Sequence, residues 1–393
     1  MKHIIAKLLL FLSLLLCQQF SKAQDSSHIR ISLLTCTPGD ELYSTFGHSA
    51  IRITDSNSVQ DIVFNYGTFN FDDEHFYLKF IRGKLLYSLS AERFDDFKAL
   101  YQETNRGITE QVLNLSAEEK LNIYHALLEN IKEENRYYKY DFFLDNCTTR
   151  LRDIIVKYKM PHPELKAVMP ETTRFRQAIH QYLDKNNKDW SKFGIDILLG
   201  APTDAVMTIP QQQFLPDNLM KALDASNKNS SLVSSETNLY PINVAEATKA
   251  SFFSPNLIFY SLLIIIVVLS FSPSKSTQNF LVRFDGFFFF LTGLLGIILI
   301  LMWTATDHAM CKNNYNLLWA LPSHTIIAFV VNSQKSWVKK YFLFTAIVLG
   351  ILLIAWFFLP QQLNNAFIPI VLLLIYRSVA RYLNTADTLE QNI

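Results

Sequence analysis

The chain has 393 residues and a formal net charge of +1; half of its residues are hydrophobic and 18% are charged. This composition excludes a disordered or collagen-like protein. The near-zero net charge gives no reason to expect a nucleic-acid partner, and 4 cysteines are too few for a scaffold built on disulfides.

Residues 1–23 are typical of an export signal. A basic start precedes an apolar run at residues 8–16, and Ser21 and Ala23 are small residues that suit a cleavage site. The apolar run is short for a membrane span. Cys17 raises the alternative of a lipoprotein signal, but the residue before it is large. We expect cleavage near Ala23 and export of the polar region after it, and an uncleaved anchor would export that region too.

Residues 24–221 are polar and mixed, and they are numerous enough to form a domain with its own core. Alternating hydrophobicity followed by turn residues predicts strands at residues 28–34, 49–53 and 61–66. Apolar residues at helical spacing predict helices at residues 120–131, 148–158 and 173–183. Strands followed by helices indicate an α+β domain. Residues 222–254 are rich in Ser, Asn, Thr and Ala, which favours a linker.

Residues 255–393 carry the pattern of a membrane domain. Five apolar segments are candidate spans: 255–271, 287–303, 317–331, 341–359 and 366–382. An exported N-terminal domain makes the first span run inward. Seven basic residues then fall on the cytoplasmic side, against Lys312 alone outside, as the positive-inside rule requires. They are Lys275, Arg283, Lys335, Lys339, Lys340, Arg377 and Arg381. Within the third segment, His324 is an ionisable group inside the membrane and therefore a functional candidate. Pro322 nearby suggests a broken helix that could simply bury it.

Cys147 has the most informative setting of the cysteines. An apolar run ends, Asp145 and Asn146 follow as candidate N-caps, and then a helix begins. A thiol at a helix N-terminus is favoured as the thiolate, which is the form that a nucleophilic cysteine needs. The local pattern alone leaves a buried structural cysteine equally open. A disulfide with Cys36 would remove the nucleophile altogether.

His48 and Asn65 are candidates for the other two roles in a catalytic triad. His48 follows a glycine turn and opens a predicted strand, so it can project from a strand end as a base. Asn65 ends the next predicted strand, where its amide could orient the imidazole. Tyr66 is the alternative for that orienting role, and ordinary strand packing would explain all three residues.

Four blocks of sequence resemble the bacterial lipoprotein N-acyltransferases of the Lnb type. They read TCTPGDELYSTFGHSAIR at 35–52, NYGTFNF at 65–71, NRYYKYDFFLDNCTTR at 135–150 and NNYNLLW at 313–319. The order of histidine before cysteine is similar to circularly permuted papain-like (NlpC-like) domains. The resemblance implies such an exported domain followed by an all-α domain of five transmembrane helices. It also implies Cys147 and His48 as the catalytic pair, with Asn65 as a weaker assignment.

The resemblance further implies a reaction and its partners. A fatty acyl chain would move from a phospholipid, through a thioester on Cys147, to the α-amino group of a lipoprotein's lipidated N-terminal cysteine. Backbone N–H groups at the start of the helix would stabilise the oxyanion. No cofactor, metal or nucleic acid is implied. The protein would cross the bacterial inner membrane, with a periplasmic N-terminal domain and a cytoplasmic C-terminus.

Four further side chains are expected to bind substrate: Tyr43, Tyr66, Arg150 and His308. His308 lies in the loop 304–316, which the proposed topology places on the same side of the membrane as the exported domain. It could bind a lipid headgroup or help to position His48. A polar loop at a membrane interface would equally explain it.

Three other functions remain open on the sequence. The same cysteine and histidine would serve a membrane-bound hydrolase that cleaves cell-wall peptides, although one span would suffice to tether it. They would equally serve a phospholipase or thioesterase, in which water replaces the amine. The exported domain could also be a binding module without catalysis, and the spans an assembly platform.

Overall fold

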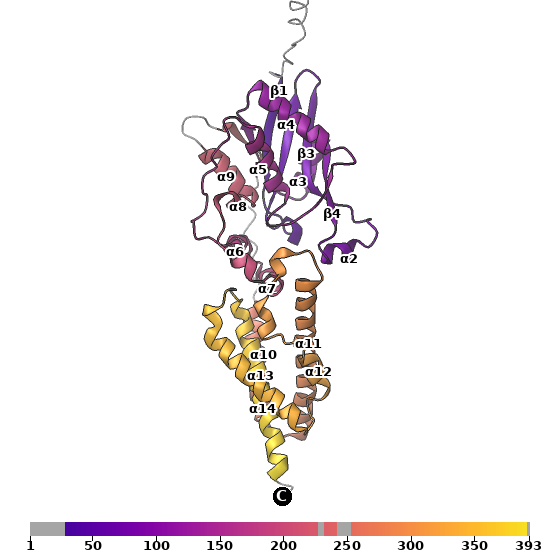
Figure 1. Ribbon diagram of the computed structural model, residues 1–393, viewed down its shortest axis with the longest axis vertical. Helices are drawn as coiled ribbons and strands as arrows, with labels where there is room; N and C mark the ends of the chain where they lie inside the picture. The colour runs from indigo at the N-terminus through magenta and orange to yellow at the C-terminus, as the bar shows by residue number, and fades with distance from the viewer. Residues whose placement is uncertain (1–27, 227–231, 242–252, 391–393) are drawn as a thin grey trace, which may run out of the picture.

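The computed structural model describes residues 28–226, 232–241 and 253–390. A sheet-rich part and a helical part follow each other along the long axis of the molecule (Figure 1). This arrangement confirms the predicted fold class, an α+β domain followed by a helical membrane domain. The expected export signal, residues 1–23, lies outside the described residues.

The N-terminal domain is built on a sheet of seven antiparallel strands in the order β6-β4-β3-β2-β1-β5-β7. The strands are β1 (Ile29–Cys36), β2 (His48–Asp55), β3 (Gln60–Thr68), β4 (Leu86–Arg93), β5 (Ile108–Leu113), β6 (Tyr137–Lys139) and β7 (Val233–Tyr240). The first three are the predicted strands. In the register of β1 and β2, Ile29 lies opposite Asp55 and Cys36 lies opposite His48. His48 is therefore at the end of the sheet far from the β2–β3 hairpin.

The prediction of a linker at 222–254 is wrong in part. It contains the end of α9 (Pro216–Ala225) and all of β7, which pairs with β5 from Val233 to Tyr240. The difference has a physical reason, because β7 is an exposed edge strand of mostly polar residues and lacks the alternating apolar face of a half-buried strand. The sheet domain thus extends to Tyr240.

Helices cover both faces of the sheet. α4 (Ala117–Asn130), α5 (Cys147–Tyr158) and α9 pack on one face, and α3 (Phe94–Glu103) packs on the other. α4 begins with a capping box, since the Ser116 hydroxyl accepts a hydrogen bond from the Glu119 amide and the Glu119 carboxylate accepts one from the Ser116 amide. α5 begins at Cys147, one residue before its predicted start.

Short helices join the sheet to the membrane domain. α6 (Phe175–Lys185), which was predicted, and α7 (Asp189–Leu198) lie between the two parts in Figure 1. The remaining short elements of this domain are η2 (Leu42–Ser44), α2 (Phe76–Ile81), η3 (Ala201–Asp204) and α8 (Ile209–Gln212).

Among the described residues, three helices of the C-terminal domain are long and apolar enough to cross a membrane. They are α11 (Lys275–Thr304), α13 (Ser336–Ala355) and α14 (Ile368–Glu390), and α10 (Pro255–Ser270) is a shorter apolar helix. The short elements are η4 (Ala309–Cys311), η5 (Tyr315–Leu318), α12 (His324–Phe329), η6 (Trp356–Phe358) and η7 (Asn365–Phe367). Residues 272–286, which separate the first two predicted segments, are mostly helix, because α11 begins at Lys275.

The third predicted span, 317–331, is not one continuous helix. It holds only η5 and α12, and it breaks around Pro322, whose nitrogen has no hydrogen to donate. The break near Pro322 was expected, and His324 is buried there. The segment lies against two glycines of α11: a Cβ on Gly293 would stand 2.3 Å from the Thr325 nitrogen, and one on Gly296 2.0 Å from the Ala320 oxygen. Irregular backbone can be accommodated at membrane depth where it is buried in protein in this way.

Two arginines counted as cytoplasmic charges are instead buried. Arg377 forms two hydrogen bonds to Asp285 of α11, at 2.6 and 2.9 Å, and Arg381 is also paired with this carboxylate. All three side chains are buried. These arginines therefore act as counter-charges inside the helix bundle, and the charge asymmetry of the membrane domain rests on the other basic residues.

Asparagines of the loop after α11 join the two domains. Asn314 donates to the backbone carbonyls of Ile197 and Leu198, and Asn316 donates to those of Asp196 and Ile197, at 2.8 to 3.1 Å. These carbonyls belong to the last turn of α7, where no intrahelical donor remains. The membrane domain thus caps a helix of the sheet domain.

Candidate active site

Cys147 is the first residue of α5, and Asn146 is its N-cap. The Asn146 side chain accepts hydrogen bonds from the amides of Thr148 and Thr149, both at 2.9 Å. Its own amide donates to the carbonyls of Phe142 and Phe214, at 2.7 and 2.8 Å. Of the two candidate N-caps, Asp145 and Asn146, it is Asn146 that caps α5. These hydrogen bonds fix the position of the Cys147 backbone.

His48 is held at the start of β2 by a turn and by a polar partner. Gly47 precedes it with φ +82°, and a Cβ there would lie 2.7 Å from the Cys36 carbonyl, so only glycine fits. His48 Nε2 lies 2.5 Å from Asn65 Oδ1. The Asn65 amide in turn donates to Glu92 at 3.3 Å. The structure therefore brings His48 and Asn65 together.

Cys147 and His48 change each other's protonation. Burial raises the pKa of the Cys147 thiol, but the charge and hydrogen bond of His48, the Ser49 amide and the Thr148 hydroxyl lower it to about 7. Burial lowers the pKa of His48, but the Cys147 charge and the hydrogen bonds to Cys147 and Asn65 leave it above its ordinary value. Both shifts favour a thiolate–imidazolium pair.

The other described cysteines differ from Cys147. Cys36, Cys147 and Cys311 are all free thiols, so the Cys36–Cys147 disulfide considered from the sequence is not formed. Burial raises the pKa of Cys36 to about 12, although a hydrogen bond to Tyr101 opposes the shift. Cys36 is therefore an inert thiol near the site, and it offers a matched control for substitutions at Cys147.

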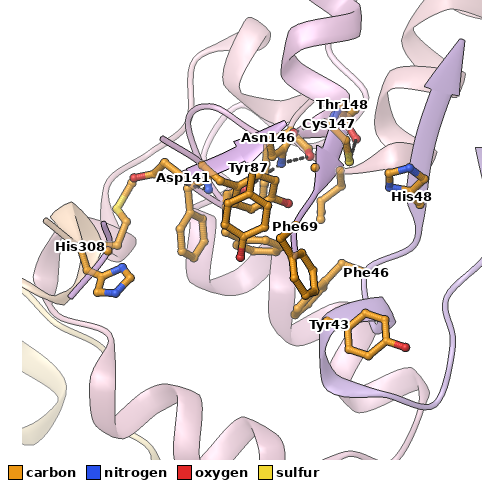
Figure 2. A pocket seen from close by; sticks show the side chains of 18 of the residues that line it. Tyr43, Phe46, His48, Phe69, Tyr87, Asp141, Asn146, Cys147, Thr148 and His308 are labelled. Carbon is orange, nitrogen blue, oxygen red and sulfur yellow. Dashed lines mark hydrogen bonds between the residues drawn. The ribbon is translucent and has the colours of Figure 1, made fainter. Parts of the chain in front are cut away.

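Cys147 and His48 line a mostly apolar cavity of about 380 Å³. Figure 2 shows both side chains at one end of this cavity and His308 at the other. Its apolar lining comes from both domains, and includes Phe46, Phe69, Phe80, Leu85, Phe142, Phe143, Leu199, Phe214, Leu215, Ala309 and Met310. The membrane domain thus completes the wall through η4.

The four predicted substrate residues divide into two pairs. Tyr43 and His308 line the cavity, but Tyr66 and Arg150 do not. Tyr66 is buried on the other face of β3 from Asn65, where its hydroxyl accepts a hydrogen bond from Asn130 of α4. Arg150 is held by Asp145 at 2.7 and 2.8 Å. Neither is placed to touch a molecule in the cavity.

The loop after α11 fixes its own polar groups on the sheet domain. His308 Nε2 lies 3.2 and 3.1 Å from the carbonyl oxygens of Phe80 and Ile81, and Asp307 pairs with Lys139 at 3.0 Å. His308 stands apart from His48, at the far end of the cavity (Figure 2). Because its imidazole is engaged by α2, His308 is not placed to position His48, as the sequence had suggested it could.

Two tyrosines of the site were not predicted from the sequence. Tyr87 of β4 stacks on Tyr140 with ring centroids 4.5 Å apart, and both line the cavity beside Cys147. Tyr140 belongs to the block at 135–150 that contains Cys147, which was the available signal. Tyr87 belongs to a strand that was not predicted. Within the described part of the chain, no group of three or more His, Cys, Asp or Glu side chains could hold a metal.

Both parts of the chain match models of known protein domains. Residues 17–190 match the Lnb N-terminal periplasmic domain, and residues 247–388 match the Lnb transmembrane domain. No curated protein and no solved structure gives a significant match. The two matched domains occur in order and together span most of the chain. The chain therefore belongs to the Lnb family, as a membrane protein with a periplasmic N-terminal domain.

Proposed function

We propose that the protein is a lipoprotein N-acyltransferase with Cys147 as its nucleophile. It moves a fatty acyl chain from a membrane phospholipid to the α-amino group of a lipoprotein's lipidated N-terminal cysteine. The observation that carries the proposal is a thiol of lowered pKa facing an apolar cavity whose wall comes from the periplasmic and membrane domains together. Such a cavity suits an acyl chain next to the bilayer.

In the first step the Cys147 thiolate attacks the ester carbonyl of the phospholipid. The carbon–oxygen bond to glycerol breaks, the acyl group stays on sulfur as a thioester, and His48 gives its proton to the leaving alkoxide. A lysophospholipid leaves. Because Asn65 engages Nε2 of His48, Nδ1 is the ring nitrogen left to face the thiol and the leaving oxygen.

The oxyanion needs a donor other than those first expected. The amides of Thr148 and Thr149 are engaged by the Asn146 cap. The Cys147 amide lies one residue earlier, in the first turn of α5, where helix amides have no intrahelical acceptor. We assign it as the oxyanion donor because it is adjacent to the reacting sulfur.

In the second step the lipoprotein amine attacks the thioester carbonyl. The carbon–sulfur bond breaks, the new amide forms, and His48 takes the proton from nitrogen while Cys147 is restored. An amide is more stable than a thioester, so this step needs no other energy source. The apolar lining around Cys147 limits water, which would otherwise hydrolyse the thioester.

We further propose five membrane crossings with the C-terminus in the cytoplasm of a bacterial inner-membrane protein. Two loops of the membrane domain contact the periplasmic domain: Asn316 bonds to α7, and so does Asn364, through Asp196 at 2.8 Å. The loops after α11 and after α13 therefore share the periplasmic side. Between them the chain must return to the start of α13, and the broken segment at 317–331 supplies that inward crossing.

Mass spectrometry of a lipoprotein's N-terminal peptide tests the reaction, in cells that lack any other N-acyltransferase. The protein should add the mass of one fatty acyl amide. Cys147→Ala should abolish the addition, while Cys36→Ala, which removes the inert buried thiol, should preserve it. An unmodified peptide with folded protein in the membrane would overturn the proposal. Release of lysophospholipid without peptide acylation would point to a phospholipase.

A further inference from the structure

The helix α2 exposes large apolar side chains to a degree unusual for a domain in water. Four of its six residues are large, apolar and exposed: Tyr77 (75% exposed), Leu78 (56%), Phe80 (51%) and Ile81 (55%). Phe71 just before it is 66% exposed. A contiguous patch of this kind marks a surface that something covers.

The interior of this segment is well ordered by its own contacts. Phe76 is buried and packs against Phe69 and Phe71, with ring centroids 5.8 and 5.0 Å apart, and it stacks on Phe80 at 6.2 Å. The segment thus has its own aromatic core around Phe76, and Phe71, Tyr77 and Phe80 contact it while more than half of each of these side chains stays exposed. Their exposure follows from the fold of the segment.

The position of α2 identifies what covers it. The carbonyl of Arg82 accepts a hydrogen bond at 2.9 Å from the amide of Asp307, three residues beyond the end of α11. His308 bonds to the carbonyls of Phe80 and Ile81. Figure 1 shows α2 beside the end of α11 that faces the periplasmic domain. α2 therefore lies at the level where α11 leaves the membrane.

The membrane surface can be placed on α11 itself. From Phe287 to Trp303 the helix carries no charged residue, a length of about 25 Å at 1.5 Å per residue. Trp303 at the periplasmic end is partly exposed, as expected for an aromatic residue at a membrane interface. The exposed basic residues Arg82 and Lys84 follow α2, where they can reach lipid headgroups while the apolar side chains enter the acyl region.

We propose that α2 is an interfacial membrane anchor, whose residues Tyr77, Leu78, Phe80 and Ile81 insert into the outer leaflet of the bilayer. Helices of this type bury their apolar face about 5 to 10 Å into the headgroup–acyl boundary. The inference concerns where the periplasmic domain meets lipid, and it does not depend on acyl transfer. Because Phe80 also lines the cavity, as do Leu42 and Tyr43 of η2, the anchor sets the mouth of the cavity at the lipid surface.

Depth-dependent fluorescence quenching tests the anchor in the full chain. Tyr77→Cys carries an environment-sensitive fluorophore, and the protein is placed in phosphatidylcholine nanodiscs that contain nitroxide-labelled lipid. Val59→Cys is the matched control: Val59 is 89% exposed in the β2–β3 hairpin, at the end of β2 opposite His48 and about 25 Å from it at strand spacing. Both variants also carry Cys147→Ala, which removes the reactive thiol. The other described cysteines, Cys36 and Cys311, are buried with raised thiol pKa values and should label poorly.

If α2 is a membrane anchor, we expect lipid nitroxide to remove about half or more of the fluorescence at position 77 and to leave the fluorescence at position 59 unchanged. Iodide in the water should act in the reverse order. A second label at Ile81→Cys should behave like the first. Equal quenching of positions 77 and 59 by iodide, with none by lipid, would overturn the proposal. Protection of position 77 from both quenchers would also overturn it, since a protein surface would then cover α2.

Discussion

His48 Nε2 and Asn65 Oδ1 lie 2.5 Å apart, across the neighbouring strands β2 and β3. This contact fixes both the plane of the imidazole and the nitrogen that faces the thiol. Because the Asn65 amide also donates to Glu92, the asparagine cannot rotate freely. In the proposed reaction Asn65 is therefore a positioning residue, whose effect passes through His48.

Asn65→Ala should lower kcat for acyl transfer while leaving KM for the phospholipid nearly unchanged. Losing a hydrogen bond to a charged group costs about 1.5 to 3 kcal/mol, or about ten- to a hundredfold in rate. Tyr66→Phe is the control, because Tyr66 is the next residue on β3 but points to the other face. Steady-state kinetics with a synthetic lipopeptide as acceptor would measure kcat and KM separately. A kcat for Asn65→Ala equal to that of the wild type would show that Asn65 does not contribute to the reaction.

The rate at which iodoacetamide alkylates Cys147 should depend on pH with a midpoint near 7, the pKa of its thiol. Below that pH the thiol is protonated and slow; above it the thiolate reacts. His48→Ala should move the midpoint upward, because the charge that offsets burial is lost. Peptide-level mass spectrometry would follow Cys147 separately from Cys36. A midpoint unchanged by His48→Ala would show that the two groups do not interact.

Acyl transfer itself should follow a bell-shaped pH profile. Its acid limb reports formation of the Cys147 thiolate. Its alkaline limb reports loss of the proton from His48, whose pKa is raised above its ordinary value and which must protonate the leaving alkoxide. Initial rates across pH, with lipid concentration held saturating, would measure both limbs. A rate that keeps rising to high pH would exclude the imidazolium as the acid.

Asn316→Ala should loosen the junction between the domains. The substitution leaves the carbonyls of Asp196 and Ile197 without this donor in a buried place, which costs about 1 to 3 kcal/mol. Asn313→Gly is the control, because Asn313 is exposed and has φ +49°, a conformation that glycine adopts readily. Thermal unfolding and limited proteolysis in detergent would compare them. Equal melting temperatures would mean that the hydrogen bonds from Asn316 to α7 add no stability.

Gly296→Ala should disrupt the packing of the membrane domain. Its Cβ would stand 2.0 Å from the Ala320 carbonyl oxygen, so the broken segment would have to move away from α11. Gly350→Ala in α13 is the matched control, since no atom lies within 4 Å of the corresponding Cβ. We expect a lower unfolding midpoint for Gly296→Ala only. If both variants unfold at the same midpoint, the close contact between Gly296 and the segment at 317–331 does not stabilise the protein.

The sequence located the catalytic candidates because their signals are local. The cap at Asn146 and the helix after it place Cys147 at a helix start, and the turn at Gly47 places His48 at a strand start. Adjacent antiparallel strands then bring His48 near Asn65, whereas Tyr66 must face the other way because side chains alternate along a strand. That alternation was available in the sequence, and it decides between the two orienting candidates.

Tertiary contacts explain what the sequence could not supply. β7 is polar, so its place in the sheet depends on pairing with β5. The segment at 317–331 is apolar enough for a helix, but its path depends on the glycine face of α11. The wall formed by Met310 and Ala309 depends on the docking of two domains. Periodicity reports local structure and burial, and it carries no information on which distant element provides the partner.

The wall supplied by η4 has a consequence for the order of assembly. Synthesis proceeds from the N-terminus, so Cys147 is made and exported well before residues 309–311 exist. Until the loop after α11 reaches the periplasmic side, the cavity lacks Ala309, Met310 and Cys311 from its lining, and α2 lacks its contacts to Asp307 and His308. A nascent chain therefore carries the thiol and its histidine without the complete cavity. The bilayer lipids around it meet a complete site only when the loop after α11 has reached the periplasmic side.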